Sequence, residues 1–187
     1  MAMNLVKLPT GKSNLLLRVC KGHFVTGHSH INYYIDVTMT KCRLAEARAA
    51  AAELVRAYAH TTVVDTILCL DGTEALGAQR WIYIQLLFRE NTAPMIAGKH
   101  VLVLAASVTT GYTAESAVEA INYYGGIPVG VAALFATRKE CAGFPITSIF
   151  DPNDLPGYES HDAHDCPWCK AGQRIDALVN SFGYSSL

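Results

Sequence analysis

The chain has 187 residues, of which 51% are hydrophobic and 17% charged, and its formal net charge at pH 7 is −1. The length favours one domain, and the near-neutral charge argues against a nucleic-acid or acidic-membrane surface. Because no apolar run reaches the ~18 residues of a membrane span and the first residues lack signal-peptide features, we expect a cytoplasmic protein with reduced cysteines.

Apolar patterns predict strands and helices that alternate along the chain. Segment 23–41 is β-branched and aromatic and predicts a hairpin, whereas the alanine-rich segment 42–58 predicts a helix. Alternation of this kind specifies a parallel α/β sheet with right-handed crossovers. The remaining predicted elements are strands at 61–70, 81–88, 101–107, 127–135 and 146–150, and helices at 113–124 and 174–182.

Ligands of parallel α/β sheets bind beyond the carboxyl ends of the strands. The loops after Leu70, Phe88 and Ala106 are therefore the candidate binding loops. The third reads SVTTGYT, and its residues Thr109, Thr110, Gly111, Tyr112 and Thr113 combine hydroxyl donors, a glycine and the start of a helix. Such a loop can hold a phosphate through hydroxyls and backbone N–H groups. An ordinary turn with a threonine cap is the alternative.

Three segments resemble type I phosphoribosyltransferases, nearest the orotate branch. Residues 98–135 resemble the motif that binds 5-phosphoribosyl-1-diphosphate (PRPP), in which a hydrophobic strand, an acidic pair and a threonine-glycine loop precede a helix. Residues 22–36, GHFVTGHSHINYYID, resemble the opening of orotate phosphoribosyltransferases. Residues 165–175, DCPWCKAGQRI, resemble a C-P-x-C-x-x-G segment of some bacterial members.

This resemblance implies an α/β fold with a parallel five-stranded sheet flanked by helices and a small N-terminal hood. The whole chain, 1–187, would be one domain, with the hood at 1–40, the α/β core at 41–150 and a Cys/His-containing tail at 151–187. Residues 109–113 would surround the 5-phosphate of a nucleotide or sugar phosphate. Family members are usually homodimers, so a homodimer is expected, without a nucleic-acid or membrane partner.

The sequence departs from the family pattern at three places that matter for catalysis. The acidic pair that holds the ribose hydroxyls falls on Ala105 and Ala106. The diphosphate loop carries Asp71 and Glu74, which bring negative charge unless Mg²⁺ intervenes. The mobile lysine-bearing loop shrinks to residues 91–99 after Arg89 and Glu90, with only Lys99 nearby.

Two functions are the main ones compatible with these departures, and an unrelated reaction at the same site, such as hydrolysis or isomerisation of a phosphorylated ligand, is a third. The first is a binding protein that retains the phosphate loop and is weakly catalytic or non-catalytic. The second is a divergent, active orotate-type enzyme in which Asp71 and Glu74 hold Mg²⁺ and Arg89 assists catalysis. A helix-capping role of Asp71 or Thr73 is the alternative for the acid.

In the N-terminal hood, His28, Tyr33 and Tyr34 are candidate contacts to PRPP or the base. The alternatives are a solvated turn for His28 and a core position for at least one tyrosine.

The tail contains His161, His164, Cys166 and Cys169 within nine residues. A CxxC pair is a common half of a structural zinc site, and histidines complete many such sites. These four residues therefore form a candidate Zn²⁺ site. The pair of cysteines with one histidine and the distant Cys141 is a second possible set, and free thiols beside an exposed turn are the alternative to any metal.

Overall fold

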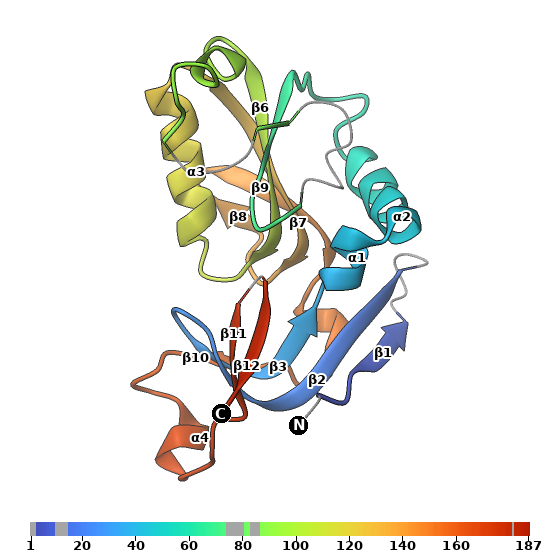
Figure 1. Ribbon diagram of the computed structural model, residues 1–187, viewed down its shortest axis with the longest axis vertical. Coiled ribbons are helices and arrows are strands. Elements are labelled where there is room, and N and C mark those ends of the chain that lie inside the picture. The colour runs from blue at the N-terminus through green and yellow to red at the C-terminus, as the bar shows by residue number, and fades with distance from the viewer. Residues whose placement is uncertain (1–2, 10–14, 74–80, 83–86, 181) are drawn as a thin grey trace. The chain divides into compact units, whose positions relative to one another are not determined.

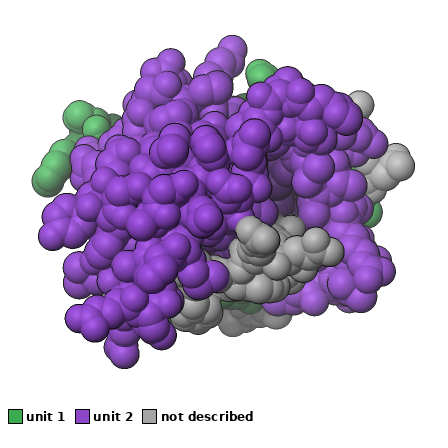
Figure 2. Space-filling model, turned by 90° about the horizontal axis from the view of Figure 1, so that it is seen from above, with its two compact units in different colours: residues 1–39, 152–187 green, residues 40–151 purple. Residues whose placement is uncertain are grey.

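The computed structural model describes residues 3–9, 15–73, 81–82, 87–180 and 182–187, and the side chains of residues 81 and 82 lie outside the description. The chain divides into two compact units, which Figure 2 distinguishes by colour. Unit 1 comprises Met1–Met39 and Pro152–Leu187, and unit 2 comprises Thr40–Asp151. The residues predicted as hood and tail thus fold together as one unit.

Unit 1 is built on a six-stranded sheet in which strands from both ends of the chain are paired. The central hairpin joins β2 (Leu16–Val25) and β3 (His30–Asp36), which are antiparallel (Figure 1). Two tail strands flank this hairpin, because β10 (Ser160–His161) pairs with β3 and β11 (Ala177–Asn180) pairs with β2. The edges are formed by β1 (Val6–Pro9) on β2 and β12 (Gly183–Ser186) on β11. Two short helices complete the unit, the 3-10 helix Pro152–Asp154 and α4 (Pro167–Lys170).

The β2–β3 hairpin contains an irregularity that places His23. The register shifts between Lys21 and Phe24, so β2 has one more residue than β3 across this step. Such a bulge re-aims the side chains within it. The imidazole of His23 consequently lies in the interior, where it is fully buried.

The prediction of a helix over 174–182 is wrong, because residues 177–180 form strand β11. Their burial alternates, with Ala177 and Val179 buried and Leu178 exposed. A period of two is the strand pattern, and pairing of β11 with β2 provides hydrogen bonds that a short helix would have to make internally.

Unit 2 is an α/β layer structure whose sheet has the strand order β5-β4-β6-β7-β9-β8. The pairs β5–β4, β4–β6, β6–β7 and β7–β9 are parallel, whereas β8 is antiparallel to β9. Five strands are therefore parallel and β8 adds a sixth, antiparallel strand, so the predicted parallel five-stranded sheet is not confirmed in this detail. The strands are β4 (Thr66–Cys69), β5 (Trp81–Ile82), β6 (His100–Val108), β7 (Ile127–Ala136), β8 (Glu140–Cys141) and β9 (Phe144–Phe150).

Helices cover both faces of this sheet, with α3 (Tyr112–Tyr123) and α2 (Leu44–Val55) on opposite sides (Figure 1). Alternate residues of β6 account for this arrangement: Val101, Val103 and Ala105 join the core under α3. Leu102 and Leu104 instead line a hollow with residues of α2. The short helix α1 (Thr38–Cys42) precedes α2, and no described helix is long and apolar enough to span a membrane.

The strand order places a switch point between β4 and β6. The next strand after β4 in the chain, β5, lies on one side of it, and β6 lies on the other. At such a point the loops that follow the two central strands diverge and leave a crevice in which ligands bind. The loops after β4 and β6 begin at Leu70 and Thr109, which are two of the three candidate loops from the sequence.

A carboxylate at the opposite end of β6 makes the stability of unit 2 depend on pH. Asp65 Oδ2 accepts hydrogen bonds from the backbone N–H of His100 (2.9 Å) and from its Nδ1 (3.0 Å). These two hydrogen bonds hold the pKa of Asp65 below its ordinary value of 3.8. The unfolded chain therefore binds more protons than the folded chain near that pH, and acidification favours unfolding.

We expect the urea midpoint of the chain to fall as the pH drops below about 4. Asp65→Asn cannot ionise, so this variant loses that part of the pH dependence while it starts from a lower midpoint at pH 7. Urea titrations of both proteins between pH 3 and pH 7 check this, and a constant difference in midpoint across the range would contradict it.

Candidate functional site

The loop between β6 and α3 ends in a left-handed glycine at the start of a helix. Gly111 is the residue that precedes the helix, and its φ of 92° lies in the left-handed region. No side chain caps the helix at this position. The first backbone N–H groups of a helix have no partner within the helix, so the start of α3 is a position that suits an anion.

Threonine hydroxyls supplement these N–H groups. Thr109 and Thr110 are half-buried, and Thr113 is exposed in the first turn of α3. Among the described residues, none of these three hydroxyls is engaged in a hydrogen bond. Tyr112 is 61% exposed, so its ring lies at the surface beside the loop.

The carbonyl side of the loop is held by residues that follow β7. Thr137 Oγ1 donates to the carbonyl of Thr109 (3.0 Å), and Arg138 Nη1 donates to the carbonyl of Thr110. Arg138 Nη1 also lies 3.3 Å from Glu115 Oε1. Two carbonyls of the loop are thus fixed by side chains of residues 137 and 138.

Gly111 is required for this packing. A Cβ atom at this residue would lie 2.8 Å from Arg138 Nη1 and 3.3 Å from Glu115 Oε1. The thiol of Cys141 is close as well and donates to the carbonyl of Gly111 (3.6 Å). Burial, and secondarily the charge of Glu115, raises the pKa of the Cys141 thiol, so it stays protonated and able to donate.

The strand that leads into the loop carries no acid at its end. Ala105 and Ala106 are buried, and Ala105 pairs with Ala133 of β7 and contributes to the core under α3. The two positions at which the sequence resemblance places the acidic pair are thus buried methyl groups.

Asp71 follows β4 and has a left-handed backbone conformation with a φ of 59°. Its carbonyl accepts a hydrogen bond from Nζ of Lys41 (2.7 Å), and Lys41 itself is buried. The hydroxyl of Thr73 donates to the carbonyls of Leu70 (2.7 Å) and Leu104 (3.0 Å) and so ties this turn to β6. Glu74, the second predicted acid, lies outside the described residues.

The segment after Arg89 forms a compact turn. Arg89 is exposed, and its carbonyl accepts hydrogen bonds from the backbone N–H groups of Thr92 (2.8 Å) and Ala93 (2.9 Å). The short 3-10 helix Ala93–Met95 follows, and Ile96 is fully buried in the core of unit 2. Ile96 therefore anchors this segment in the core of unit 2.

Two of the three predicted base contacts in unit 1, Tyr33 and Tyr34, lie in its interior. Tyr33 and Tyr34 are 2% and 4% exposed. The hydroxyl of Tyr33 donates to the carbonyl of Pro156 (2.8 Å) and its ring stacks on Tyr158, while Tyr34 packs against Phe24. Both tyrosines therefore belong to the core of unit 1, and burial raises the pKa of Tyr34 to about 12.

His28 is exposed and lies in the β2–β3 turn. The turn is closed by Thr26, whose hydroxyl donates to the carbonyl of Ser29 (2.9 Å). Residues 25–30 and 162–165 line a hollow of about 340 Å³, so His28 and His164 share its wall.

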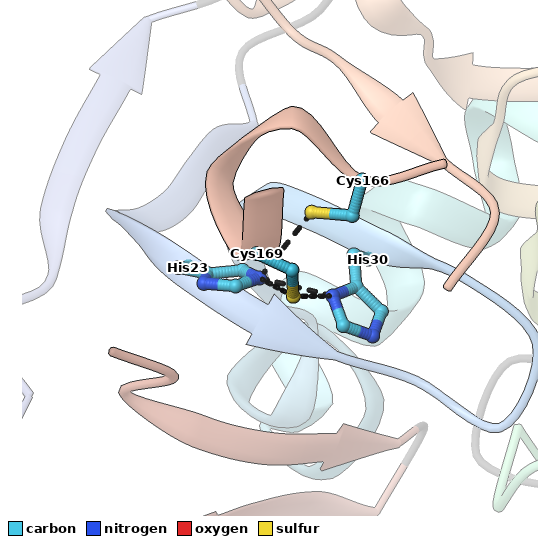
Figure 3. A group of neighbouring side chains, drawn as sticks. All are labelled: His23, His30, Cys166 and Cys169. Carbon is cyan, nitrogen blue, oxygen red and sulfur yellow. Dashed lines mark hydrogen bonds between the residues drawn. The ribbon is translucent and has the colours of Figure 1, made fainter. Parts of the chain in front are cut away.

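Two cysteines and two histidines converge where the β2–β3 hairpin meets the segment of α4 (Figure 3). The group consists of His23, His30, Cys166 and Cys169, and one potential ligand atom from each lies within 4.8 Å of all the others. Cys169 Sγ lies 3.3 Å from His30 Nδ1 and 3.6 Å from His23 Nε2. In the described part of the chain, this is the one such group of three or more residues.

The structure brings together the predicted cysteines but not the predicted histidines. His161 contacts Glu159 (3.1 Å) and packs against Trp168, and His164 is exposed. Cys141, the alternative distant ligand, belongs to unit 2.

His23 and His30 are the residues that the sequence interpretation missed. They lie more than 130 residues before the cysteines, so no local spacing connects the two pairs. The available signal was a histidine on each strand of a predicted hairpin, flanking the turn TGHS.

The sequence matches no family model and no curated protein. Solved structures do match. A phosphoribosyltransferase from Corynebacterium diphtheriae is 22% identical with a TM-score of 0.56, covering 74% of this chain and 90% of that chain. The orotate phosphoribosyltransferase of Mycobacterium tuberculosis H37Rv is 21% identical with a TM-score of 0.57, covering 74% and 92%.

A third match is the adenine phosphoribosyl transferase of Trypanosoma brucei, solved in complex with AMP, pyrophosphate and ribose-5-phosphate. It is 14% identical with a TM-score of 0.55, covering 89% of this chain and 92% of that chain. These matches extend over nearly the full length of the solved chains. The chain therefore has the fold of the type I phosphoribosyltransferases, and orotate enzymes are among the proteins that it resembles in structure.

Proposed function

We propose that residues 109–113 bind the 5-phosphate of a phosphorylated ribose compound, either PRPP or a nucleotide. The observation that carries this proposal is the loop itself. It combines a left-handed glycine, a helix start without a side-chain cap and three threonine hydroxyls. Two of its carbonyls accept hydrogen bonds from Thr137 and Arg138. A phosphate is an acceptor with several oxygens, so it matches a site that offers hydroxyl and backbone N–H donors.

The solved structures support the same class of ligand. The Trypanosoma brucei enzyme was solved with AMP and ribose-5-phosphate, both of which carry a 5-phosphate on ribose. The loop after β6 lies at the switch point of the sheet, where α/β folds bind such ligands.

We propose further that the protein is weakly catalytic or non-catalytic. Phosphoribosyl transfer develops positive charge on the ribose and releases diphosphate, so it requires acids near the sugar, cations near the leaving group and exclusion of water. Ala105 and Ala106 provide no carboxylate, and each lost charge-assisted hydrogen bond to a ribose hydroxyl is worth about 1.5–3 kcal/mol. The compact turn at 91–99 offers no lid.

The alternative is a divergent orotate-type phosphoribosyltransferase that uses Asp71 and Glu74 with Mg²⁺. One observation favours it: Asp71 follows β4 at the switch point, in a left-handed conformation that is uncommon for a residue other than glycine. A carboxylate there is a suitable Mg²⁺ ligand beside a diphosphate.

Release of diphosphate distinguishes the two proposals. The chain is incubated with PRPP, Mg²⁺ and each of a panel of bases that includes orotate and adenine. Ordinary enzyme turnover begins at roughly 1 s⁻¹. We expect this chain to release diphosphate at least about 1,000-fold more slowly than that. Turnover in the ordinary range that disappears in Asp71→Asn would establish the alternative instead.

A further inference from the structure

The four side chains of the Cys/His group reach a common point from three separate segments. His23 lies in the bulge of β2, and His30 is the first residue of β3. Cys166 immediately precedes α4, and Cys169 lies within it. His23 and Cys166 are fully buried, and His30 is 7% exposed. Cys169 is the exposed member of the group. Such an arrangement gives a bound ion a shielded position with one accessible side.

The separations between the ligand atoms match the edges of a tetrahedron around a zinc ion. With Zn–N near 2.05 Å and Zn–S near 2.3 Å, a nitrogen and a sulfur ligand stand about 3.5 Å apart. Three of the four nitrogen–sulfur distances in this group are 3.6, 3.6 and 3.3 Å, and the fourth, between His30 and Cys166, is within 4.8 Å. The two nitrogens are 2.9 Å apart, so they need to separate by about 0.4 Å to reach tetrahedral spacing.

Hydrogen bonds outside the group orient the first histidine for metal binding. His23 Nδ1 lies 3.2 Å from the carbonyl oxygen of Gln173, which can only accept a hydrogen bond. Nδ1 therefore carries the proton, and Nε2 presents its lone pair to the group. A metal-bound histidine commonly donates its other N–H in this way. The backbone of His23 is fixed as well, since its N–H donates to Asp176 Oδ2 (2.8 Å).

We propose that His23 Nε2, His30 Nδ1, Cys166 Sγ and Cys169 Sγ bind one Zn²⁺ ion as a structural site. Two thiols lose their protons to solvent when the ion binds, and the two imidazoles remain neutral. Two thiolates and two imidazoles in a tetrahedral arrangement select zinc. Four protein ligands leave no position for water or substrate, so the ion stabilises the fold and takes no part in a reaction.

The ion joins the N-terminal hairpin to the tail within unit 1. β2 and β3 come from the start of the chain and α4 from its end, so the site closes a long loop of sequence. Small units with a limited core commonly depend on such metal sites. The turn 26–29, which carries His28 at the hollow described above, lies between the two histidine ligands. Its position depends on both.

The test is metal analysis of the full-length chain purified without a histidine tag. We expect about one zinc per chain after dialysis against metal-free buffer, and two protons released per zinc on reconstitution. His30→Ala and Cys169→Ser each weaken zinc binding by more than the 10–100-fold typical of losing an outer-shell partner. Strong chelators lower the thermal midpoint of the wild type by at least about 5 °C.

Two control variants separate this site from the one predicted by sequence spacing. His164→Ala and Cys42→Ser alter exposed residues outside the group and retain full zinc content. If the ligand variants fail to fold, Co²⁺ bound to the wild type still reports thiolate ligation through its sulfur-to-metal charge-transfer absorption. A wild-type chain that binds neither ion stoichiometrically, or loss of zinc in His164→Ala with retention in His30→Ala, overturns the proposal.

Discussion

Gly111→Ala is expected to weaken the binding of a 5-phosphate by at least about tenfold, which corresponds to about 1.4 kcal/mol. Any residue other than glycine pays about 1–2 kcal/mol to adopt the left-handed conformation of this position. The added Cβ would also stand 2.8 Å from Arg138 Nη1, which binds the neighbouring carbonyl of Thr110. Relief of the backbone strain moves the loop, and a shift of the Arg138 side chain away from the new Cβ weakens its hydrogen bond to the carbonyl of Thr110.

Gly98→Ala is the matched control for this variant. Gly98 also has a positive φ, 67°, but no atom lies within 4 Å of its added Cβ, and the residue is remote from the loop in sequence. Both variants should lose stability from backbone strain, while only Gly111→Ala should lose phosphate affinity. Calorimetric titration with ribose 5-phosphate measures the difference, and equal affinities of the two variants would contradict the role of Gly111.

Gly22→Ala is expected to destabilise the chain by about 1–3 kcal/mol, the usual cost of overpacking. A Cβ at Gly22 would lie 2.6 Å from Asp176 Oδ2 and 2.7 Å from Phe24 Cζ. Neither atom can retreat easily, because Phe24 is buried and Asp176 Oδ2 accepts the N–H of His23. Displacement of Asp176 also moves His23, so we expect zinc content to fall together with stability.

Gly27→Ala, in the turn of the same hairpin, provides the comparison. No atom lies within 4 Å of its added Cβ, and its φ is not positive. The substitution should leave stability unchanged or raise it slightly, since alanine restricts the unfolded chain. Urea unfolding of both variants checks the contrast, and equal midpoints would show that the bulge tolerates a side chain.

The phosphate loop could be predicted from the sequence because its signal is local. A buried strand, the residues TTGYT and an amphipathic helix are contiguous, so the conformation follows from a few neighbouring side chains. The structure places these elements as β6, the loop and α3, with the helix starting at Tyr112, one residue before the predicted bound. What the loop binds stays a prediction.

Only the two cysteines of the Cys/His group could be predicted from the sequence. The CxxC spacing is local and identified Cys166 and Cys169. The two histidines lie near these cysteines only because of how the strands of the sheet are paired. The register of β2 with β3, and the bulge at Gly22 and His23, determine which histidines face the cysteines. His161 and His164 are close to the cysteines in sequence, but their side chains are not part of the group in the structure. The strand β11 was missed for a related reason, since its short ALVN segment becomes a strand through pairing with β2.

Calorimetric titration of the wild-type chain with ribose 5-phosphate, and in parallel with ribose, tests most directly the claim that residues 109–113 bind a 5-phosphate. Charge-assisted hydrogen bonds contribute about 1.5–3 kcal/mol each, so the phosphate should strengthen binding by at least about tenfold over ribose. Substitution of Thr109 and Thr110 by valine should remove most of that difference. Equal affinities for the two ligands, or no binding of ribose 5-phosphate, PRPP or any nucleoside 5-phosphate, would contradict the account.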